Sequence, residues 1–405
     1  MNRLFFSLCA GAVGCAFALP FPATAIAKSK LYTETVLYPF PSYTYPLANL
    51  IDVKGTLYGT TFAGGANGLG TVFSVNPKTG AETVLYSFGS SGTDGYFPVA
   101  SLIDVKGTLY GTTEYGGTYG DGTVFSVNPK TGAETVVHSF GSGTDGSGTE
   151  ANLIYVKSTG TLYGTTYAGG TNGDGTVFSL DLKTGAETVV YSFCSQANCA
   201  DGEEPDAGLI DVNGTLYGTT FLGGTTGDIC STRSCGTVFA LDPSSGTETV
   251  LYSFSGSGTG DGANPEASLL YMNGTLYGTT VSGGIYETGL GTLFSVDPTT
   301  GAETVLHSFG GTSDGISPVG NLIDVKGTLY GITFGGGNGN HGGTAYSINP
   351  TTGAENVIYF FCSQANCADG TQPDAGLIDL KGTFYGTTEQ GGANDGGTVF
   401  ALKKP

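Results

Sequence analysis

Apolar and polar residues alternate along this chain in short runs that return in a fixed order. Within residues 48–88, β-branched and aromatic residues fill four such runs, each bounded by Gly-rich or Pro-containing turns. Pro77 sets the first corner of one turn, and Gly80 is free to adopt the left-handed conformation that closes a hairpin. Helical periodicity is nearly absent, so the pattern predicts a four-stranded antiparallel sheet. The predicted strands are residues 48–54, 56–62, 71–75 and 82–88.

This unit is repeated along the chain. The stretch Gly55-Thr-Leu-Tyr-Gly-Thr-Thr61 returns six times, with single substitutions at Ile332 and Phe384. The later copies begin at Gly107, Gly160, Gly214, Gly274, Gly327 and Gly382, which gives spacings of 52, 53, 54, 60, 53 and 55 residues. A period near 50 is typical of propeller or solenoid arrays. Strands that are apolar on both faces favour blades stacked face to face around an axis over a sandwich with one wet face.

The two ends of the array supply complementary parts of one blade. Residues 34–40 match the fourth strand of a blade, with no partner strands before them. Residues 375–380, 383–388 and 398–402 supply the first three strands of a blade whose fourth strand is missing. Pairing the two fragments would remove the exposed edges of an open array. We therefore expect an all-β fold, a seven-bladed β-propeller with four antiparallel strands per blade, formed by residues 28–405 as one domain and closed by the N-terminal strand.

The N-terminus has the pattern of a signal peptide, which we place at residues 1–27. Arg3 precedes a nearly unbroken apolar run over residues 4–19, and Ala25-Ile-Ala27 offers a small-residue cleavage site. The run is shorter than the roughly 20 residues of a spanning helix. A lipid anchor at Cys15 is the weaker alternative, because the preceding residues fit the required box poorly. We expect a secreted or periplasmic protein without membrane insertion.

Charge narrows the classes of partner. The chain has 34 acidic and 14 basic residues and a net charge of -20. Such a surface repels nucleic acid and anionic lipid headgroups, whereas cations, neutral sugars and proteins remain possible partners. Nothing in the pattern demands oligomerisation, so we expect a monomer.

The repeat resembles a known family. Leu-Tyr-Gly-Thr-Thr-x-x-Gly-Gly, then Gly-Thr-Val-Phe-Ser, then Pro-x-Thr-Gly-x-Glu-Thr-Val-Leu-Tyr-Ser-Phe is similar to the bacterial GloVer tandem repeat of exported proteins, over nearly all of residues 31–405. That resemblance implies export but brings no established activity. The Gly-Gly pair and the following turn are also similar to Kelch blades. Kelch blades carry a Trp after the turn and this chain has none, so that likeness is architectural.

Six cysteines follow the signal peptide, and all of them occur as Cys-x4-Cys pairs in extended loops. In an exported protein this arrangement predicts three local disulfides. Zinc binding is the alternative, but zinc sites favour shorter gaps and combine pairs or add His. The predicted pairs are Cys194 with Cys199, Cys230 with Cys235, and Cys362 with Cys367.

An Asp-Gly pair recurs between successive blades, and several copies continue to a Pro and an acid, as at Asp206, Glu266 and Asp374. These loops share a face with the Gly-rich loops, so they could form a ring of carboxylates around the channel mouth, suited to Ca²⁺ or to sugar hydroxyls. The competing interpretation is that Asp-Gly is favourable turn chemistry, repeated because the blade is repeated. His341, in a Gly-rich loop, is the histidine expected on the ligand face. The Asp-Gly candidates are Asp94, Asp145, Asp201, Asp261, Asp314 and Asp369.

Three other recurring positions have structural explanations. The Asp of Leu-Ile-Asp becomes Tyr155 and Tyr271 in two blades, which favours a turn-capping or channel-lining role over catalysis. His138 and His307 replace a Tyr of the fourth strand, where we expect solvent exposure. The Tyr of the Leu-Tyr-Gly motif, first Tyr58, lies mid-strand and is expected to pack between blades.

These observations predict an exported β-propeller that acts as a binding or scaffolding module, without catalytic activity, for an extracellular glycan or protein. The alternative is a secreted polysaccharide lyase or glycosidase, because the fold alone excludes no chemistry. An enzyme should break the symmetry at one place, and His341, Glu204 and Arg233 are the sparse candidates. A purely structural surface repeat is the third hypothesis. We expect no cofactor, with Ca²⁺ binding as the alternative.

Overall fold

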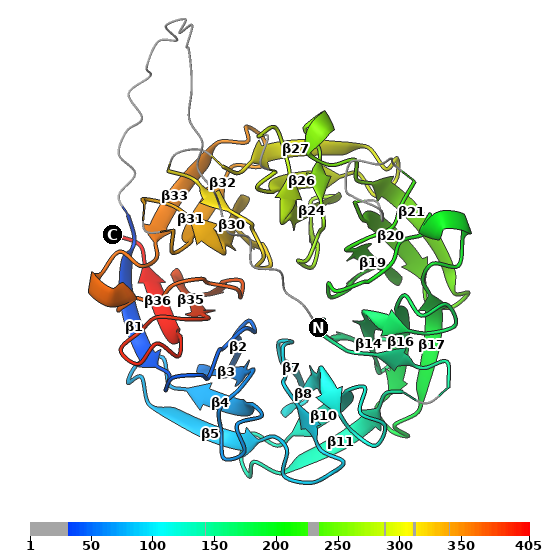
Figure 1. Cartoon of the computed structure of the whole chain (residues 1–405), viewed down its shortest axis with the longest axis horizontal. Coiled ribbons are helices and arrows are strands. Elements are labelled where there is room, and N and C mark those ends of the chain that lie inside the picture. The colour runs from blue at the N-terminus through cyan, green and yellow to red at the C-terminus, as the bar shows by residue number, and fades with distance from the viewer. Residues whose placement is uncertain (1–30, 142, 226–234, 287–288, 311–312, 340) are drawn as a thin grey trace, which may run out of the picture.

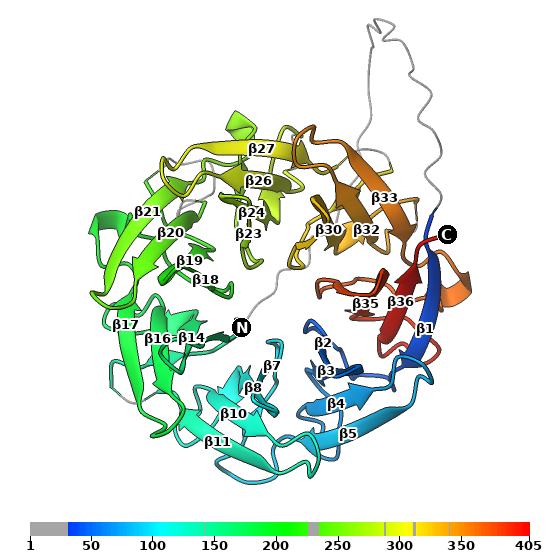
Figure 2. The same cartoon turned by 180° about the vertical axis from the view of Figure 1, so that it is seen from behind.

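The computed structural model describes residues 31–405 except 142, 226–234, 287–288, 311–312 and 340. These residues form seven four-stranded antiparallel sheets arranged as a ring around a central axis (Figure 1). The reverse view shows the same ring, with the fourth strands following one another around the rim (Figure 2). The predicted all-β, seven-bladed propeller is therefore confirmed.

Each blade runs from a short strand at the axis to a longer strand at the rim. The first strands are β2 (Ile51–Val53), β7 (Ile103–Val105), β13 (Ile154–Val156), β18 (Ile210–Val212), β23 (Leu270–Met272), β29 (Ile323–Val325) and β34 (Ile378–Leu380). The second strands are β3 (Thr56–Thr61), β8 (Thr108–Thr113), β14 (Thr161–Thr166), β19 (Thr215–Thr220), β24 (Thr275–Thr280), β30 (Thr328–Thr333) and β35 (Thr383–Thr388). The third strands are β4 (Thr71–Val75), β10 (Thr123–Val127), β16 (Thr176–Asp181), β20 (Thr237–Asp242), β26 (Thr292–Val296), β32 (Thr344–Ile348) and β36 (Thr398–Lys403). The fourth strands are β5 (Glu82–Ser87), β11 (Glu134–Ser139), β17 (Glu187–Ser192), β21 (Thr247–Ser253), β27 (Glu303–Ser308), β33 (Glu355–Phe360) and, from the N-terminus, β1 (Thr33–Pro39).

The ring is closed by the two ends of the chain. Strand β1 pairs antiparallel with β36, from Thr33 opposite Lys403 to Pro39 opposite Thr398. The N–H of Tyr32 also donates to the carbonyl of Ile358 in the neighbouring blade at 2.8 Å. The seventh sheet therefore has the order β1-β36-β35-β34, which confirms the predicted closure, because the N-terminal strand covers the edge that β36 would otherwise expose.

Aromatic rings fill the interfaces between blades. The ring that follows each fourth strand packs against the ring of the next blade's third strand, as Phe88 does on Phe125 with centroids 4.9 Å apart. Such edge-on or tilted pairs add to the burial energy of the rings themselves. The motif glycine is required here, because a Cβ on Gly59 would lie 2.7 Å from Phe73 Cζ. The remaining interface pairs are Phe40–Phe73, Phe140–Phe178, Phe193–Phe239, Phe254–Phe294, Phe309–Tyr346 and Phe361–Phe400.

The recurring motif tyrosines pack between blades, as expected. Tyr58 lies against a buried cluster that includes Leu102 and Leu109 of the following blade. The same arrangement is repeated around the ring by Tyr110, Tyr163, Tyr217, Tyr277, Tyr330 and Tyr385.

Buried threonines join the second and third strands of every blade. The hydroxyls of Thr61 and Thr71 are 2.8 Å apart, and Thr61 also donates to the carbonyl of Ala63. Satisfying these hydroxyls inside the blade avoids the cost of burying unpaired polar groups. The other pairs are Thr113–Thr123, Thr166–Thr176, Thr220–Thr237, Thr280–Thr292, Thr333–Thr344 and Thr388–Thr398.

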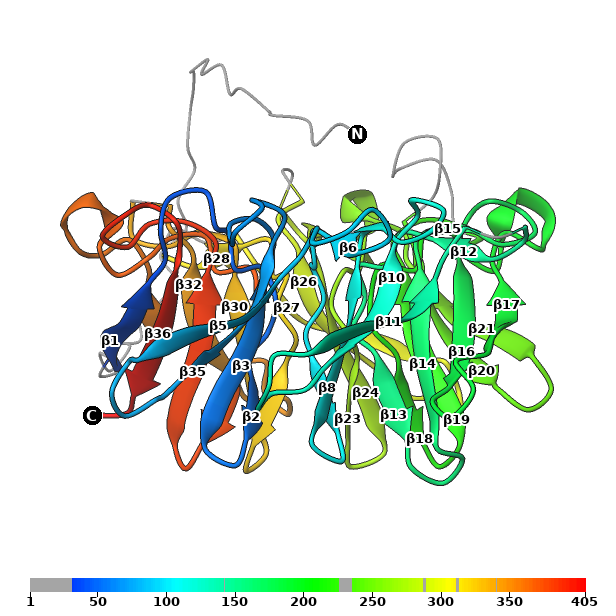
Figure 3. The ribbon, with the colours of Figure 1, turned by 90° about the horizontal axis from the view of Figure 1, so that it is seen from below.

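One face of the ring carries the Asp-Gly and Gly-rich loops, and the opposite face carries the hairpins between first and second strands (Figure 3). In four blades a two-residue ladder ties the Gly-rich loop to the preceding Asp-Gly segment. The ladders are β6 (Gly95–Tyr96) with β9 (Tyr115–Gly116), β12 (Gly146–Ser147) with β15 (Ala168–Gly169), β22 (Gly262–Ala263) with β25 (Ser282–Gly283), and β28 (Gly315–Ile316) with β31 (Gly335–Gly336). Single bridges, Glu203 to Leu222 and Thr371 to Gln390, take their place in two others.

Helical structure in the described part of the chain includes three single 3₁₀ turns, η1 (Ala197–Cys199), η3 (Ser257–Thr259) and η4 (Ala365–Cys367). No described helix is long and apolar enough to cross a membrane. On the hairpin face, the Asp of Leu-Ile-Asp caps its turn, as when Gly55 N–H donates to Asp52 Oδ1 at 2.8 Å. The same bond recurs at Asp104, Asp211, Asp324 and Asp379, which confirms the predicted turn-capping role.

Candidate functional site

The Asp-Gly carboxylates point toward the rim of the ring. In Asp94 the carboxylate is buried and accepts a hydrogen bond from Tyr86 Oη at 2.8 Å and another from Ser90 N–H. Asp201, Asp261 and Asp369 accept the same bond from Tyr191, Tyr252 and Tyr359. In Asp145 and Asp314 the partner is the Nε2 of His138 or His307 at 3.0 Å. This geometry agrees with the turn role, and a ligand role for these six residues stays a prediction.

The predicted solvent exposure of His138 and His307 was wrong. Their side chains are only 18% and 20% exposed. Each ring lies edge-on against the Phe two residues later, Phe140 or Phe309, with centroids 4.8 Å apart. The Asp-Gly loop folds back over the end of the fourth strand and covers the imidazole, which a strand pattern alone does not reveal. His341, in contrast, is exposed on its Gly-rich loop.

A glutamate from the next blade completes each of these interfaces. Burial, followed by the charge of the nearby Asp, raises the pKa of these carboxyls above the usual range. The pKa is about 7 for Glu34, Glu134, Glu187 and Glu355, and about 8 for Glu248 and Glu303. From the sequence, this glutamate was assigned only a place in the fourth strand. Its recurrence in every blade was the feature that could have indicated a shared role at the interfaces.

A second group of carboxylates surrounds the axis. The segments that lead from the Asp-Gly loops into the first strands line a cavity of about 160 Å³ in the central channel. At one position of these segments the side chains are acidic in four blades and aliphatic in three. The acidic residues are Glu150, Asp206, Glu266 and Asp374, and the aliphatic ones are Leu47, Val99 and Val319. We call these seven residues with their cavity the acidic pocket.

Two residues further along each segment, a belt of amides and hydroxyls links neighbouring blades. Ser101 N–H donates to Asn152 Oδ1 at 2.7 Å, and Ser268 N–H donates to Asn321 Oδ1 at 2.8 Å. Asn49 donates from its N–H to Ser101 Oγ and accepts the N–H of Gly376 at its Oδ1. A Cβ on Gly376 would lie 2.6 Å from the carbonyl oxygen of Asn321, so these two neighbouring blades approach closely at this level.

Asp206 is a strongly perturbed carboxyl of the acidic pocket. Its Oδ1 is buried and accepts no hydrogen bond within the described structure. Burial, then the charges of Glu150, Glu266 and Glu204, raises its pKa well above the usual range. A buried acceptor without a donor is costly, so the pocket is suited to a cation or to a group that brings hydrogen-bond donors.

The backbone holds this segment in a fixed position. Glu204 adopts a left-handed conformation at φ 54° directly before Pro205. Its N–H donates to the carbonyl of Asp174 at 3.0 Å, and its carbonyl accepts the N–H of Phe221 at 2.9 Å. The segment is thus tied to the preceding blade and to its own, and the pocket is preorganised. Of the pocket acids, the sequence pointed to Asp206, Glu266 and Asp374, but Glu150 was missed because Thr149 replaces the usual Pro before it.

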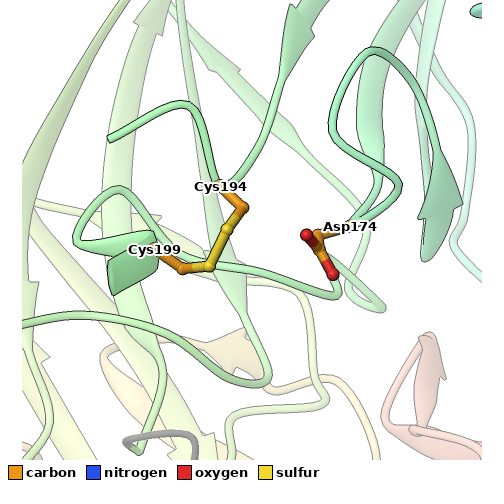
Figure 4. A group of neighbouring side chains, drawn as sticks. All are labelled: Asp174, Cys194 and Cys199. Atoms are coloured by element: carbon orange, nitrogen blue, oxygen red, sulfur yellow. A yellow bond between two sulfur atoms is a disulfide. The ribbon is translucent and has the colours of Figure 1, made fainter. Parts of the chain in front are cut away.

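Two of the three predicted disulfides are present. Cys194 is bonded to Cys199 and Cys362 to Cys367, each across a 3₁₀ turn. Cys230 lies outside the described residues, so its pairing with Cys235 stays a prediction. Asp174 lies beside the first pair, with the three potential ligand atoms within 4.8 Å of one another (Figure 4). Because the two sulfurs are joined to each other, they are not available as thiolate ligands for a metal.

Comparison with known proteins identifies the repeat. The Gloeobacter/Verrucomicrobia repeat matches residues 25–230 and 195–400, and so nearly the whole propeller. The chain belongs to this family. No curated protein matches the chain.

Solved structures share the architecture at low sequence identity. An oligogalacturonate lyase in complex with manganese is 13% identical with a TM-score of 0.55, over 92% of this chain and 93% of that one. The oligogalacturonate lyase of Vibrio parahaemolyticus is 11% identical with a TM-score of 0.54, over 92% and 94%. The extracellular domain of a hybrid two-component system of B. thetaiotaomicron is 13% identical with a TM-score of 0.59, over 91% of this chain and 39% of that one. These likenesses establish the propeller fold of this family member and nothing finer.

Proposed function

We propose that this propeller is an exported binding module whose acidic pocket takes a sugar unit of an extracellular glycan. The observation that carries the proposal is the buried, unpartnered Oδ1 of Asp206 inside a cavity on the axis. The two disulfides support an oxidising compartment outside the cytoplasm.

The chemistry of the pocket favours a neutral, hydroxyl-rich ligand. Its lining contains four carboxyl side chains and, among the described residues, no Lys or Arg. Acidic polysaccharides would therefore be repelled, whereas sugar hydroxyls can donate to the carboxyl oxygens. Leu47, Val99 and Val319 offer apolar surface to the carbon-bound faces of a sugar ring.

A secreted polysaccharide-acting enzyme is the second candidate. It is favoured by the similarity of the fold to two oligogalacturonate lyases, and paired carboxyl groups with raised pKa values are used in glycoside hydrolysis. The pKa of Asp206 is raised, and three further carboxyl side chains line the same cavity, so the experiment must separate binding from cleavage.

The test is a thermal-unfolding screen of the full protein against neutral and acidic polysaccharides, followed by chromatography of the recovered glycan. We expect a neutral glycan to raise the melting temperature and to be recovered uncut. Asp206→Asn and Glu266→Gln should weaken binding by about two- to tenfold, since a hydrogen bond contributes about 0.5–1.5 kcal/mol. Asp324→Asn, which alters a turn cap outside the pocket, should bind normally.

Two results would contradict the proposal. Equal affinity of wild type and Asp206→Asn for the glycan would show that the glycan does not bind in the acidic pocket. Shortening of the glycan by wild type but not by the variants would establish the enzyme instead.

A further inference from the structure

We propose that His138, Asp145 and Glu187 form a binding site for one divalent transition-metal ion, with Zn²⁺ as the preferred occupant. This site is separate from the acidic pocket and lies at the rim, between the second and third blades. One potential ligand atom from each residue lies within 4.8 Å of the other two. The three residues come from β11, from the loop after it, and from the start of β17.

The existing geometry needs little change to admit an ion. His138 Nε2 and Asp145 Oδ2 are 3.0 Å apart. With metal–ligand bonds of about 2.1 Å and a tetrahedral angle, two ligand atoms lie about 3.4 Å apart. Replacing the hydrogen bond by a metal ion therefore requires these two atoms to separate by only about 0.4 Å.

The carboxylate oxygens of Asp145 and Glu187 are placed to allow this exchange of a hydrogen bond for a metal ion. The N–H of Gly146 donates to Asp145 Oδ1 at 2.8 Å, which orients the carboxylate and leaves Oδ2 toward the imidazole. Glu187 Oε1 is buried and accepts no hydrogen bond within the described structure. An ion at this point would give the buried glutamate oxygen the partner that it lacks.

The donor set fits a divalent ion in charge and type. Two carboxylates neutralise its charge, and a neutral imidazole supplies the nitrogen. Imidazole and carboxylate donors in a tetrahedral arrangement suit Zn²⁺, which the Irving–Williams order places above Mn²⁺ and below Cu²⁺ in affinity. Because the His138 side chain is 18% exposed, water can complete a four-coordinate shell, as it does where three protein groups bind zinc.

The other blade interfaces provide internal comparisons. Five of them have Tyr where His138 stands, and in four of these the Tyr hydroxyl donates to the Asp-Gly carboxylate. Burial raises the pKa of Tyr86, so its phenol stays protonated and is a poor ligand. At the interface of His307, Asp314 Oδ2 also accepts the N–H of Gly310. Among the described residues, no second group that includes a histidine meets the 4.8 Å limit.

Calorimetric titration of the chelator-treated full protein with ZnCl₂ tests the site, together with metal analysis after dialysis. We expect one ion per chain, and a loss of affinity of at least about 100-fold in His138→Tyr. That variant should fold, because Tyr occupies this position at five interfaces of the same chain, four of them with the same Asp partner. His307→Tyr is the matched control and should keep the wild-type affinity.

Glu187→Gln gives a second, independent measurement, because it retains the shape of the side chain and removes the charged ligand. It should weaken Zn²⁺ binding while His138 remains in place. Absence of a bound ion in wild type, or equal affinity in wild type and His138→Tyr, would overturn the proposal.

Discussion

Replacement of Glu248 by Gln should stabilise the protein at alkaline pH. Glu248 lies near the start of β21, on the side that faces the preceding blade. Both of its carboxyl oxygens are buried without a hydrogen-bond partner in the described structure. Burial and then the charge of Asp201 raise its pKa to about 8, while the nearby Tyr191 hydroxyl, which donates its hydrogen bond to Asp201, lowers it. Near pH 8 and above, the folded protein must carry an ionised, poorly solvated carboxylate beside another carboxylate.

The sign and size of the effect follow from this pKa. A folded-state value above the unfolded value means that the contribution of Glu248 to stability is fully present below about pH 4.5. It is then lost as the pH rises toward about 8. A difference of about 3.5 pKa units corresponds to at most about 5 kcal/mol. Because the side chain is only half-buried and solvent screens its charge, we expect about 1–2 kcal/mol.

The measurement is the melting temperature of wild type and Glu248→Gln between pH 4.5 and pH 8.5. For a propeller of this length, a gain of 1–2 kcal/mol raises the melting temperature by about 1–3 °C. The two proteins should differ most at pH 8.5 and little at pH 4.5.

A matched control is available at the equivalent position of the first blade. Glu82 is also raised in pKa by burial, but its neighbour is Tyr38 and not an Asp, so Glu82→Gln should give a smaller gain. An unchanged or lower melting temperature of Glu248→Gln at pH 8.5, with the same pH profile as wild type, would refute the reasoning.

Three further predictions concern stability. Thr220→Val removes a hydroxyl that bonds to Thr237 and Leu222, so it should lower the free energy of unfolding in denaturant by about 1–3 kcal/mol. Thr219→Val, at a buried hydroxyl without a described partner, should be neutral or stabilising. Equal losses in the two variants would contradict the hydrogen-bond assignment. Replacing Cys194 and Cys199 by Ser opens a loop with a sequence separation of 5 and should cost about 2 kcal/mol by the chain-entropy relation; a reducing agent should destabilise wild type more than this variant. Removing residues 31–39 leaves β36 without its outer partner, so we expect aggregation that increases with protein concentration and is measured by light scattering. A monomer with the wild-type melting temperature would show that this closure does not stabilise the ring.

The sequence by itself determined the blade, the number of blades and their closure. The repeated run around Tyr58, the turn at Pro77 and Gly80, and the cap at Asp52 depend on neighbours within one blade. The split blade was visible because β1 and β36 each carry the pattern of a known strand of the repeat. Because the same local interactions recur in seven blades, the residues that make them stand out as a repeated pattern in the sequence. These features could therefore be predicted.

Only the tertiary structure decided which side chains meet between blades. The Asp-Gly carboxylates were placed on the correct loops, but their burial against Tyr86 and its equivalents appears only when the loop folds over the fourth strand. Glu187 meets His138 across 49 positions of sequence, and Asp206 meets Glu150 and Glu266 across 56 and 60. Such contacts form when the blades pack around a common axis. A pattern read within one repeat specifies the blade, whereas both candidate sites depend on how neighbouring blades face one another.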